Sequence, residues 1–175
     1  LIKVVRNLLD PAYANDLYNR CLSMPMQRSS LDDWKSNLTD GKNAPPILLN
    51  NLDTTDENII MHRLKGLFEL PLNATQYLTV QRWEFGCYIP WHNDGKYNYS
   101  STIYLNPEWH HNDGGQFVYK LDNNDEFYGI NESYTPEFNS AVVVKNTDKG
   151  HYHTVTPILT QDKTRITIQF FAYSE

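Results

Sequence analysis

Two imidazoles and one carboxylate in this sequence have the types and the spacing of a metal-binding set. His92 and Asp94 are two positions apart, so their side chains point the same way on an extended segment. A third ligand has to come from elsewhere in the fold, and His153, far downstream, is the candidate. Two histidines and one carboxylate form the facial triad that holds Fe(II) and leaves coordination positions open for a co-substrate and O2.

An arginine downstream of His153 indicates that such a co-substrate would carry a negatively charged group. Arg165 lies in the clearest strand pattern of the chain, residues 164–172, where it shares one face with Thr167 while apolar residues occupy the other. On the inward face of a small barrel a guanidinium needs an anion, because an unpaired buried charge is very costly. Its planar fork suits a carboxylate, and an internal ion pair to Asp or Glu is the alternative.

A second His-x-Asp motif, His111 to Asp113, competes with the first one. It lies beside Gly114 and Gly115, a dipeptide that is typical of turns. We therefore interpret it as a solvated polar turn and not as a metal site.

The first 75 residues carry helix signals. Asp10 before Pro11 is an N-cap followed by proline at the first helical position, and Thr54 with Glu57 has the spacing of a capping box. The elements expected here are a strand at residues 2–9, a helix from 10 to about 23, loop and turn at 24–50, and a helix from 54 that Pro71 ends.

From Gln76 onward, alternating patterns and turn dipeptides predict strands. Several short strands with turns between them favour a sandwich or jelly-roll barrel with helices packed outside. The acidic, aromatic stretch 122–138 is expected to be a lid, a binding loop or a mobile surface loop. The strands expected are residues 77–85, 100–105, 116–121, 140–145 and 164–172.

The overall composition narrows the class of protein. The chain has 175 residues, 40% of them hydrophobic and 21% charged, which suits one globular domain and excludes a disordered protein. No apolar run approaches the roughly 20 residues that a membrane span needs. The formal charge of −6 disfavours nonspecific binding to nucleic acid or anionic membrane. The two cysteines, Cys21 and Cys87, suit a reducing compartment and favour a cytoplasmic location.

Five stretches, taken in order, carry a resemblance to a known family. They are residues 88–94 (YIPWHND), 101–109 (STIYLNPEW), 113–117 (DGGQF), 153–157 (HTVTP) and 165–168 (RITI). The set resembles the Fe(II)- and 2-oxoglutarate-dependent dioxygenases, and within them the prolyl 4-hydroxylase-like branch. This resemblance implies a mainly β fold, a double-stranded β-helix at 76–173. Residues 1–75 would support it as a helical and loop segment, giving a single domain over 1–175.

The resemblance also implies roles for individual residues. Arg165 would pair with the distal carboxylate of 2-oxoglutarate. Tyr104 would donate its hydroxyl to the same carboxylate, and Thr167 would add a further hydrogen bond. O2 would be the other co-substrate, with ascorbate a candidate reductant. The residues that would bind Fe(II) are His92, Asp94 and His153.

The chain departs from the pattern of this branch next to the first metal ligand. Trp91, and not proline, directly precedes His92, so no substrate-side role is assigned to Tyr88. His151 lies two residues before His153 and would share its face of an extended segment. His153 is preferred because the His-x-Val-x-Pro pattern fits it, and His151 is expected behind the metal or in solvent.

These features predict an oxygenase that hydroxylates a substrate, a peptidyl proline by resemblance, with release of succinate and CO2. Related iron halogenases lack the carboxylate that Asp94 supplies, which favours hydroxylation. The substrate is expected to be a peptide, a protein or a small molecule, and the charge disfavours nucleic acid. The sequence does not give the oligomeric state.

Two other classes of protein stay open. One is a cupin-like metal-dependent enzyme that is not an oxygenase, because the same three ligands bind other metals too. The other is a jelly-roll carbohydrate-binding module. Its candidate sugar-binding aromatic residues are Trp83, Trp91, Tyr97, Tyr99 and Trp109.

Overall fold

The computed structural model describes residues 1–28, 45–70, 73–95, 97–120, 131–146 and 151–173. In chain order the elements are β1 (Ile2–Arg6), α1 (Pro11–Ser23), β2 (Leu48–Asn50), α3 (Thr54–Phe68), β3 (Thr75–Trp83), β4 (Ile89–His92), β5 (Tyr99–Tyr104), the 3-10 turn η1 (His111–Asp113), β6 (Phe117–Lys120), β7 (Asn131–Tyr134), β8 (Ser140–Lys145), β9 (His153–Val155) and β10 (Arg165–Tyr173).

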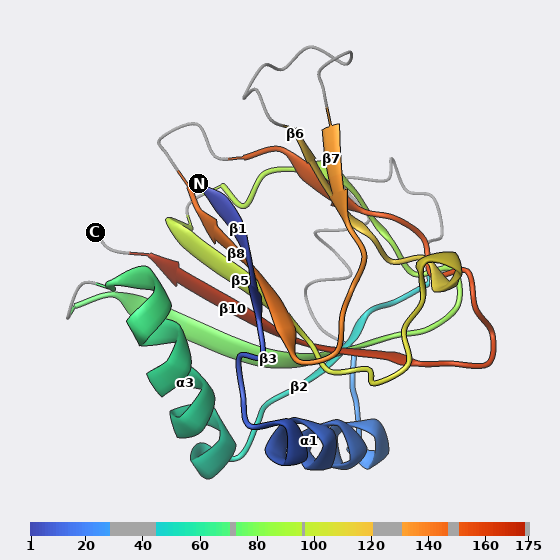
Figure 1. Ribbon diagram of the computed structural model, residues 1–175, viewed down its shortest axis with the longest axis horizontal. Coiled ribbons are helices and arrows are strands. Elements are labelled where there is room, and N and C mark those ends of the chain that lie inside the picture. Colours follow the sequence, from blue (N-terminus) through green and yellow to red (C-terminus); the bar gives the residue numbers. More distant parts are fainter. Residues whose placement is uncertain (29–44, 71–72, 96, 121–130, 147–150, 174–175) are drawn as a thin grey trace.

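Within these residues the strands form two antiparallel sheets (Figure 1). The larger sheet has the order β1-β8-β5-β10-β3-β2, and the smaller one has the order β4-β9-β6-β7. From β3 onward the chain passes back and forth between the two sheets, so neighbouring strands are mostly distant in sequence. This is the arrangement of a double-stranded β-helix, and the expected fold class is confirmed.

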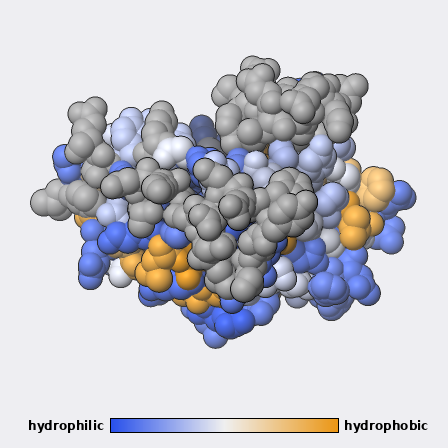
Figure 2. All heavy atoms as spheres, turned by 90° about the horizontal axis from the view of Figure 1, so that it is seen from above, coloured by the Kyte–Doolittle hydropathy of each residue, from blue (hydrophilic) through white to orange (hydrophobic). Residues whose placement is uncertain are grey.

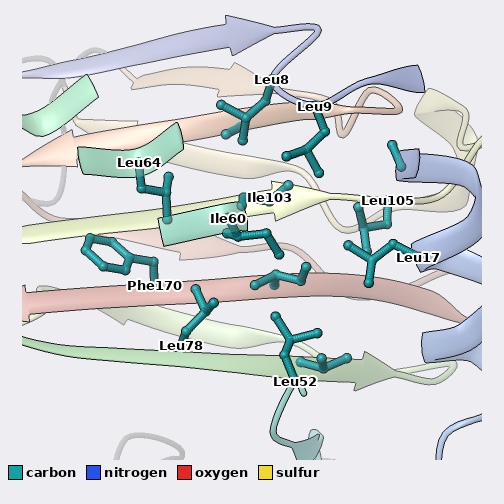
Figure 3. Packing of buried hydrophobic residues seen from close by; sticks show 14 of the residues in the cluster. Leu8, Leu9, Leu17, Leu52, Ile60, Leu64, Leu78, Ile103, Leu105 and Phe170 are labelled. Atoms are coloured by element: carbon teal, nitrogen blue, oxygen red, sulfur yellow. The ribbon is translucent and has the colours of Figure 1, made fainter. Parts of the chain in front are cut away.

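Helices α1 and α3 cover the outer face of the larger sheet (Figure 1). Their apolar residues, such as Leu17, Ile60 and Leu64, form one buried cluster with Ile103 of β5 and Phe170 of β10 (Figure 3). Burial of such apolar area is the main force that fixes the helices on the sheet.

Strand β10 has the two faces that its alternating sequence predicts. Ile166, Ile168 and Phe170 lie in the cluster under the helices. Arg165 and Thr167 are also buried, but they belong to the opposite face, between the two sheets. The inward face of β10 therefore carries buried polar side chains at Arg165 and Thr167, which is unusual for a core position and indicates a site.

The helix boundaries agree with the sequence, except for one cap. Asp10 caps α1, as predicted, with Oδ1 accepting from two backbone N–H groups. The capping box predicted at Thr54 is wrong by one residue, because Asp53 is the N-cap of α3 and accepts from the backbone N–H of Asp56. Aspartate is a better N-cap than threonine, and Asp53 stands one position before Thr54. The predicted stop at Pro71, and residues 29–44 of the stretch predicted as loop and turn, lie outside the described residues.

Four short strands were not predicted. They are β2, β4, β7 and β9, each of three or four residues. Such segments are too short to show an alternating hydrophobic pattern. Their hydrogen-bonding partners are strands that only the folded structure brings next to them. Strand β2, for example, lies in a region predicted as loop and pairs with β3. Of the stretch 122–138, residues 131–134 form β7 on the edge of the smaller sheet, while 122–130 lie outside the described residues.

The described surface seen in Figure 2 is mostly hydrophilic, with small hydrophobic patches. No helix among the described residues is both long and apolar enough to cross a membrane. Cys21 and Cys87 are both buried, and neither forms a disulfide.

A polar link between the two helices gives a first testable prediction. Asp56 of α3 accepts hydrogen bonds from the Tyr13 hydroxyl (2.7 Å) and from two guanidinium nitrogens of Arg20, both on α1. Replacing Asp56 with alanine leaves these donors unpaired, so we expect a loss of about 2–3 kcal/mol in the free energy of unfolding, measured with urea. The matched control is Asp16→Ala, which removes an exposed partner of the same arginine and should change stability by less than about 0.5 kcal/mol.

The same link should make stability depend on pH. The hydrogen bond from Arg20 holds the pKa of Asp56 below its ordinary value. A carboxyl with a lowered folded-state pKa stabilises the fold above its ordinary pKa of about 4. That contribution is lost as the pH falls through the folded-state pKa. An acid titration of stability that is identical in the wild type and in Asp56→Ala would contradict this assignment.

Candidate active site

The three predicted metal ligands meet between the two sheets. His92 ends β4 and His153 begins β9, and the register of the smaller sheet places them directly opposite each other. The His92 and His153 Nε2 atoms lie 3.8 and 3.6 Å from Asp94 Oδ1. One ligand atom from each of the three residues lies within 4.8 Å of the other two, a spacing that could hold one metal ion.

Each histidine is oriented by a backbone carbonyl two residues earlier in the chain. His92 Nδ1 lies 2.8 Å from Pro90 O, and His153 Nδ1 lies 2.8 Å from His151 O. A carbonyl oxygen can accept but not donate, so each Nδ1 carries the proton and each Nε2 keeps its lone pair for a metal. His151 thus contributes its carbonyl from behind the cluster, and its side chain does not join it.

Electrostatics favour a neutral imidazole at His92. Burial, and then the neighbouring His153, lower the pKa of His92 to about 4, while its hydrogen bond to Pro90 and the Asp94 carboxylate act in the opposite direction. Asp94 is fixed by Ser100, whose hydroxyl donates to Oδ2 at 2.6 Å, and this leaves Oδ1 on the histidine side. A neutral nitrogen pair with one carboxylate oxygen is a donor set that divalent iron accepts.

The cluster lines a pocket of about 520 Å³ between the sheets. The smaller sheet contributes His92, Phe117 and His153, and the larger sheet contributes Arg165 and Gln169. This volume accommodates a small co-substrate together with part of a second molecule.

Arg165 also lines this pocket, and its guanidinium has unpaired donors. Its guanidinium is 1% exposed and lies over the rings of Trp83 (4.6 Å) and Tyr104 (5.2 Å). Nη1 donates to Gly115 O at 3.1 Å, but Nη2 and Nε have no hydrogen-bond partner among the described residues. Burial lowers the pKa of Arg165 to about 10. No described carboxylate pairs with it, so within that part of the chain the internal ion pair considered from sequence is not found.

Tyr104 adds a second unpaired donor beside Arg165, although it is not among the residues that line the pocket. Its hydroxyl is buried and has no partner among the residues described, and burial raises its pKa to about 12, so it stays protonated. Together with Arg165 it offers N–H and O–H groups to a carboxylate that the protein itself does not supply. Buried donors without partners are rare and costly, so these atoms fit an anionic co-substrate.

Thr167 is held by a bond that the sequence did not indicate. Its Oγ1 accepts from Trp83 Nε1 at 3.1 Å, and the residue is fully buried. Thr167 therefore fixes the indole on which Arg165 lies. The hydrogen bond from Thr167 to a co-substrate stays a prediction.

The second His-x-Asp motif is a turn, as interpreted, but its carboxylate is not solvated. His111 is exposed, whereas Asp113 is buried and accepts from Lys163 Nζ (2.7 Å) and from the backbone N–H of His110 (2.7 Å). The aromatic residues proposed for sugar binding are also mostly interior, since Trp83, Tyr99 and Trp109 are buried. Neither set forms a second site.

A comparison with protein families identifies the chain. The model of the 2OG-Fe(II) oxygenase superfamily matches residues 78–171. The chain belongs to this superfamily. The matched range begins in β3 and ends in β10, so it contains both the cluster and Arg165. Oxygenases of this superfamily use Fe(II), 2-oxoglutarate and O2.

Solved structures show the same fold at low sequence identity. A prolyl-4-hydroxylase from Pseudomonas putida is 14% identical, with a TM-score of 0.71 over 99% of this chain and 92% of that one. A prolyl hydroxylase from Trichoplax adhaerens, in complex with a hypoxia inducible factor peptide fragment, is 15% identical, with a TM-score of 0.68 over 98% and 83%. HygX from Streptomyces hygroscopicus, with nickel, 2-oxoglutarate and hygromycin B bound, is 9% identical, with a TM-score of 0.68 over 98% and 82%. No curated protein matches the chain by sequence.

Membership of the superfamily decides between the classes left open by the sequence. It supports the oxygenase, and neither a cupin-like enzyme of another kind nor a sugar-binding module gains support from the geometry. The side chains that sequence reasoning missed are Trp83 and Ser100, which position the predicted residues. A buried tryptophan on the strand beside Arg165, and a serine that begins the next predicted strand, were the available signals.

Proposed function

We propose that this oxygenase is a 2-oxoglutarate-dependent hydroxylase whose substrate is a peptidyl proline. The observation that carries the proposal is one pocket with two chemically different ends. The His92, Asp94 and His153 cluster lines it, and the unpaired donors of Arg165 lie at the other end. A keto acid with a carboxylate at its far end can reach from one to the other.

The residues of the pocket take distinct roles in this proposal. His92 and His153 would bind Fe(II) through Nε2, and Asp94 through Oδ1. Bound Fe(II) supplies the activation of O2 that is coupled to decarboxylation of 2-oxoglutarate. Overall, one oxygen atom of O2 enters a substrate C–H bond to give C–OH, and the other enters succinate as CO2 leaves.

Arg165 and Tyr104 would hold the distal carboxylate of 2-oxoglutarate. Charge-assisted hydrogen bonds from a guanidinium are strong, and the buried position strengthens them further. With this end fixed, the keto-acid end is held at the metal, which replaces a chance encounter with a fixed geometry.

A peptide substrate is supported by the nature of the structural neighbours. Two of those described above are prolyl hydroxylases, and one of them was solved with a peptide. A small-molecule substrate is the second candidate, because HygX, with hygromycin B bound, has a similar fold.

The test is a proline-containing peptide array incubated with Fe(II), 2-oxoglutarate and O2 and read by mass spectrometry. The expected result is a gain of 16 daltons on individual peptides, with succinate formed in equal amount, and no gain when the proline is replaced by alanine. Peptide-independent succinate formation without any modified peptide would favour the small-molecule candidate. A chlorinated product in the presence of chloride would contradict hydroxylation.

Gly115 gives a further prediction, because it leaves the room that Arg165 occupies. Its φ is +69°, and a Cβ at this position would lie 2.7 Å from Arg165 Nη1 and 2.8 Å from Ile158 Cδ1. Gly115→Ala should therefore displace the guanidinium and raise the KM for 2-oxoglutarate at least tenfold, since a misplaced carboxylate clamp loses on the order of 1.4 kcal/mol or more.

The matched control is Gly66→Ala in α3, where a Cβ meets nothing within 4 Å. This change should stabilise the helix by up to about 1 kcal/mol and leave the KM for 2-oxoglutarate as it is. A Gly115→Ala protein with an unchanged KM for 2-oxoglutarate would show that Arg165 is not held from this side.

A further inference from the structure

Two glutamines on the floor of the pocket have no role in the proposed chemistry. Gln81 lies on β3 and Gln169 on the neighbouring β10, and both line the pocket. The register places Gln81 opposite Thr167, and Gln169 lies two residues beyond Thr167 and four beyond Arg165 on β10. The two carboxamides are therefore diagonal neighbours on one face, within mutual reach of a single small group.

Gln81 carries an unpaired acceptor. The residue is 5% exposed, and its Oε1 is buried without a hydrogen-bond partner among the described residues. A buried carbonyl without a donor costs free energy, and such groups in native proteins call for a partner from outside the chain. The partner that suits it is an N–H or O–H group entering the pocket.

Gln169 carries an oriented donor. Its Oε1 accepts from the Thr102 hydroxyl at 2.7 Å, and its Nε2 faces the Phe170 carbonyl, which can only accept, so the carboxamide is oriented. The nitrogen end reaches Phe170 O at 3.4 Å, which is longer than an ordinary hydrogen bond. The NH2 group thus keeps donor capacity on the side of the pocket.

We propose that Gln81 and Gln169 together bind a secondary amide of the substrate. Gln81 accepts the amide N–H and Gln169 donates to the amide C=O, and the pair determines which substrates enter. This inference rests on the proposed function, because it assigns the glutamines to the substrate of that same pocket.

The charges and the walls of the pocket favour an amide over other polar groups. Among the described lining residues, the ionic or metal-ligating side chains are His92, Asp94, His153 and Arg165, all of which the metal and the co-substrate would use. The remaining polar partners are neutral, so a charged substrate group gains nothing there. Much of the rest of the lining is apolar, including Leu49, Val142, Val144 and Phe171. An apolar pocket with a few placed polar groups suits an apolar ring that carries one amide better than a polyol.

The test observes the two side chains directly by NMR. The full chain is labelled with ¹⁵N and loaded with Zn(II), which the same ligands bind and which is diamagnetic, and with 2-oxoglutarate. The side-chain NH2 signals are assigned by their loss in Gln81→Leu and Gln169→Leu. The probes are N-acetyl-L-proline N-methylamide and its methyl ester, which has the same shape without the N–H.

The expected result is that the amide shifts both NH2 signals in a saturable way. The ester should bind about tenfold more weakly, and Gln81→Leu should weaken binding of the amide by a similar factor, as expected for one neutral hydrogen bond. Gln81→Leu should fold, since it removes an unpaired acceptor at similar volume, and Gln81→Glu provides a second variant that keeps the acceptor but adds a charge.

Three outcomes would overturn the inference. One is equal binding of amide and ester. Another is a shift of the two signals on addition of 2-oxoglutarate with none from the amide, which would place the glutamines at the co-substrate. The third is saturable binding of methyl glucoside in place of the amide. If peptides are hydroxylated but the probe shifts neither signal, the inference fails and the proposed function stands. If no peptide is hydroxylated but the amide binds, hydroxylation of peptidyl proline fails and the amide-binding role of the glutamines stands.

Discussion

In the His153→Ala protein, the visible charge-transfer band that Fe(II) and 2-oxoglutarate produce together without oxygen is expected to disappear. The wild type should show the band only when both are present. His153 supplies one of three ligand atoms that lie within 4.8 Å of one another. Loss of an outer partner of a metal ligand already lowers metal affinity about 10–100-fold, so loss of the ligand itself should cost more. An anaerobic titration followed by absorption spectroscopy measures this without knowledge of the substrate.

The matched control is His111→Ala, which removes the histidine of the other His-x-Asp motif. His111 is exposed and belongs neither to the cluster nor to the pocket lining, so this variant should keep the full band. A band that persists in His153→Ala and vanishes in His111→Ala would show that the metal binds at the motif of His111 and Asp113 and not at the cluster. Bound iron without any band in the wild type would mean that 2-oxoglutarate does not chelate the metal.

The positions of the ligands could be predicted from sequence because their chemistry is local. His92 and Asp94 show the two-residue spacing of an extended segment, and Arg165 lies in the strand with the most regular alternation. The pairing of His153 with His92 across β4 and β9 is not local. It depends on the register of two strands of three and four residues, which carry no readable period of their own.

The supporting residues could not be predicted because their roles depend on tertiary contacts. Ser100 donates to Asp94 across the connection from β4 to β5, and Trp83 reaches Thr167 across the pairing of β3 with β10. Asp113 shows the converse. Its sequence context indicates a polar turn, yet Lys163 from a distant segment pairs with it and makes burial tolerable. Periodicity assigns a residue to one face of a strand, but tertiary packing decides which polar groups on that face find hydrogen-bond partners.

The Arg165→Met protein is expected to lose 2-oxoglutarate binding without losing stability. The charged end of this side chain is buried, and two of its nitrogens have no partner among the described residues. Replacing an uncompensated buried charge with an apolar side chain of similar volume is neutral or stabilising by about 1–4 kcal/mol. The methionine also keeps contact with the rings of Trp83 and Tyr104, which its thioether suits. The charge-transfer band and the rise in Tm caused by 2-oxoglutarate should both disappear.

Arg82→Met is the matched control, because this arginine lies opposite Ile166, next to Arg165 in the sheet register, and points the other way. Arg82 Nη2 donates to the carbonyls of Leu22 (2.5 Å) and Met24 (3.1 Å) at the end of α1, so its loss should cost about 1–3 kcal/mol while 2-oxoglutarate still binds. Equal destabilisation by the two changes, with 2-oxoglutarate affinity intact in Arg165→Met, would make Arg165 a structural residue. The opposite signs expected for the two variants follow from one physical difference. Nη2 of Arg82 donates to backbone carbonyls of the protein, and only its Nε is buried without a partner among the described residues. Arg165 has one backbone partner through Nη1, and its Nη2 and Nε are left for a ligand to satisfy.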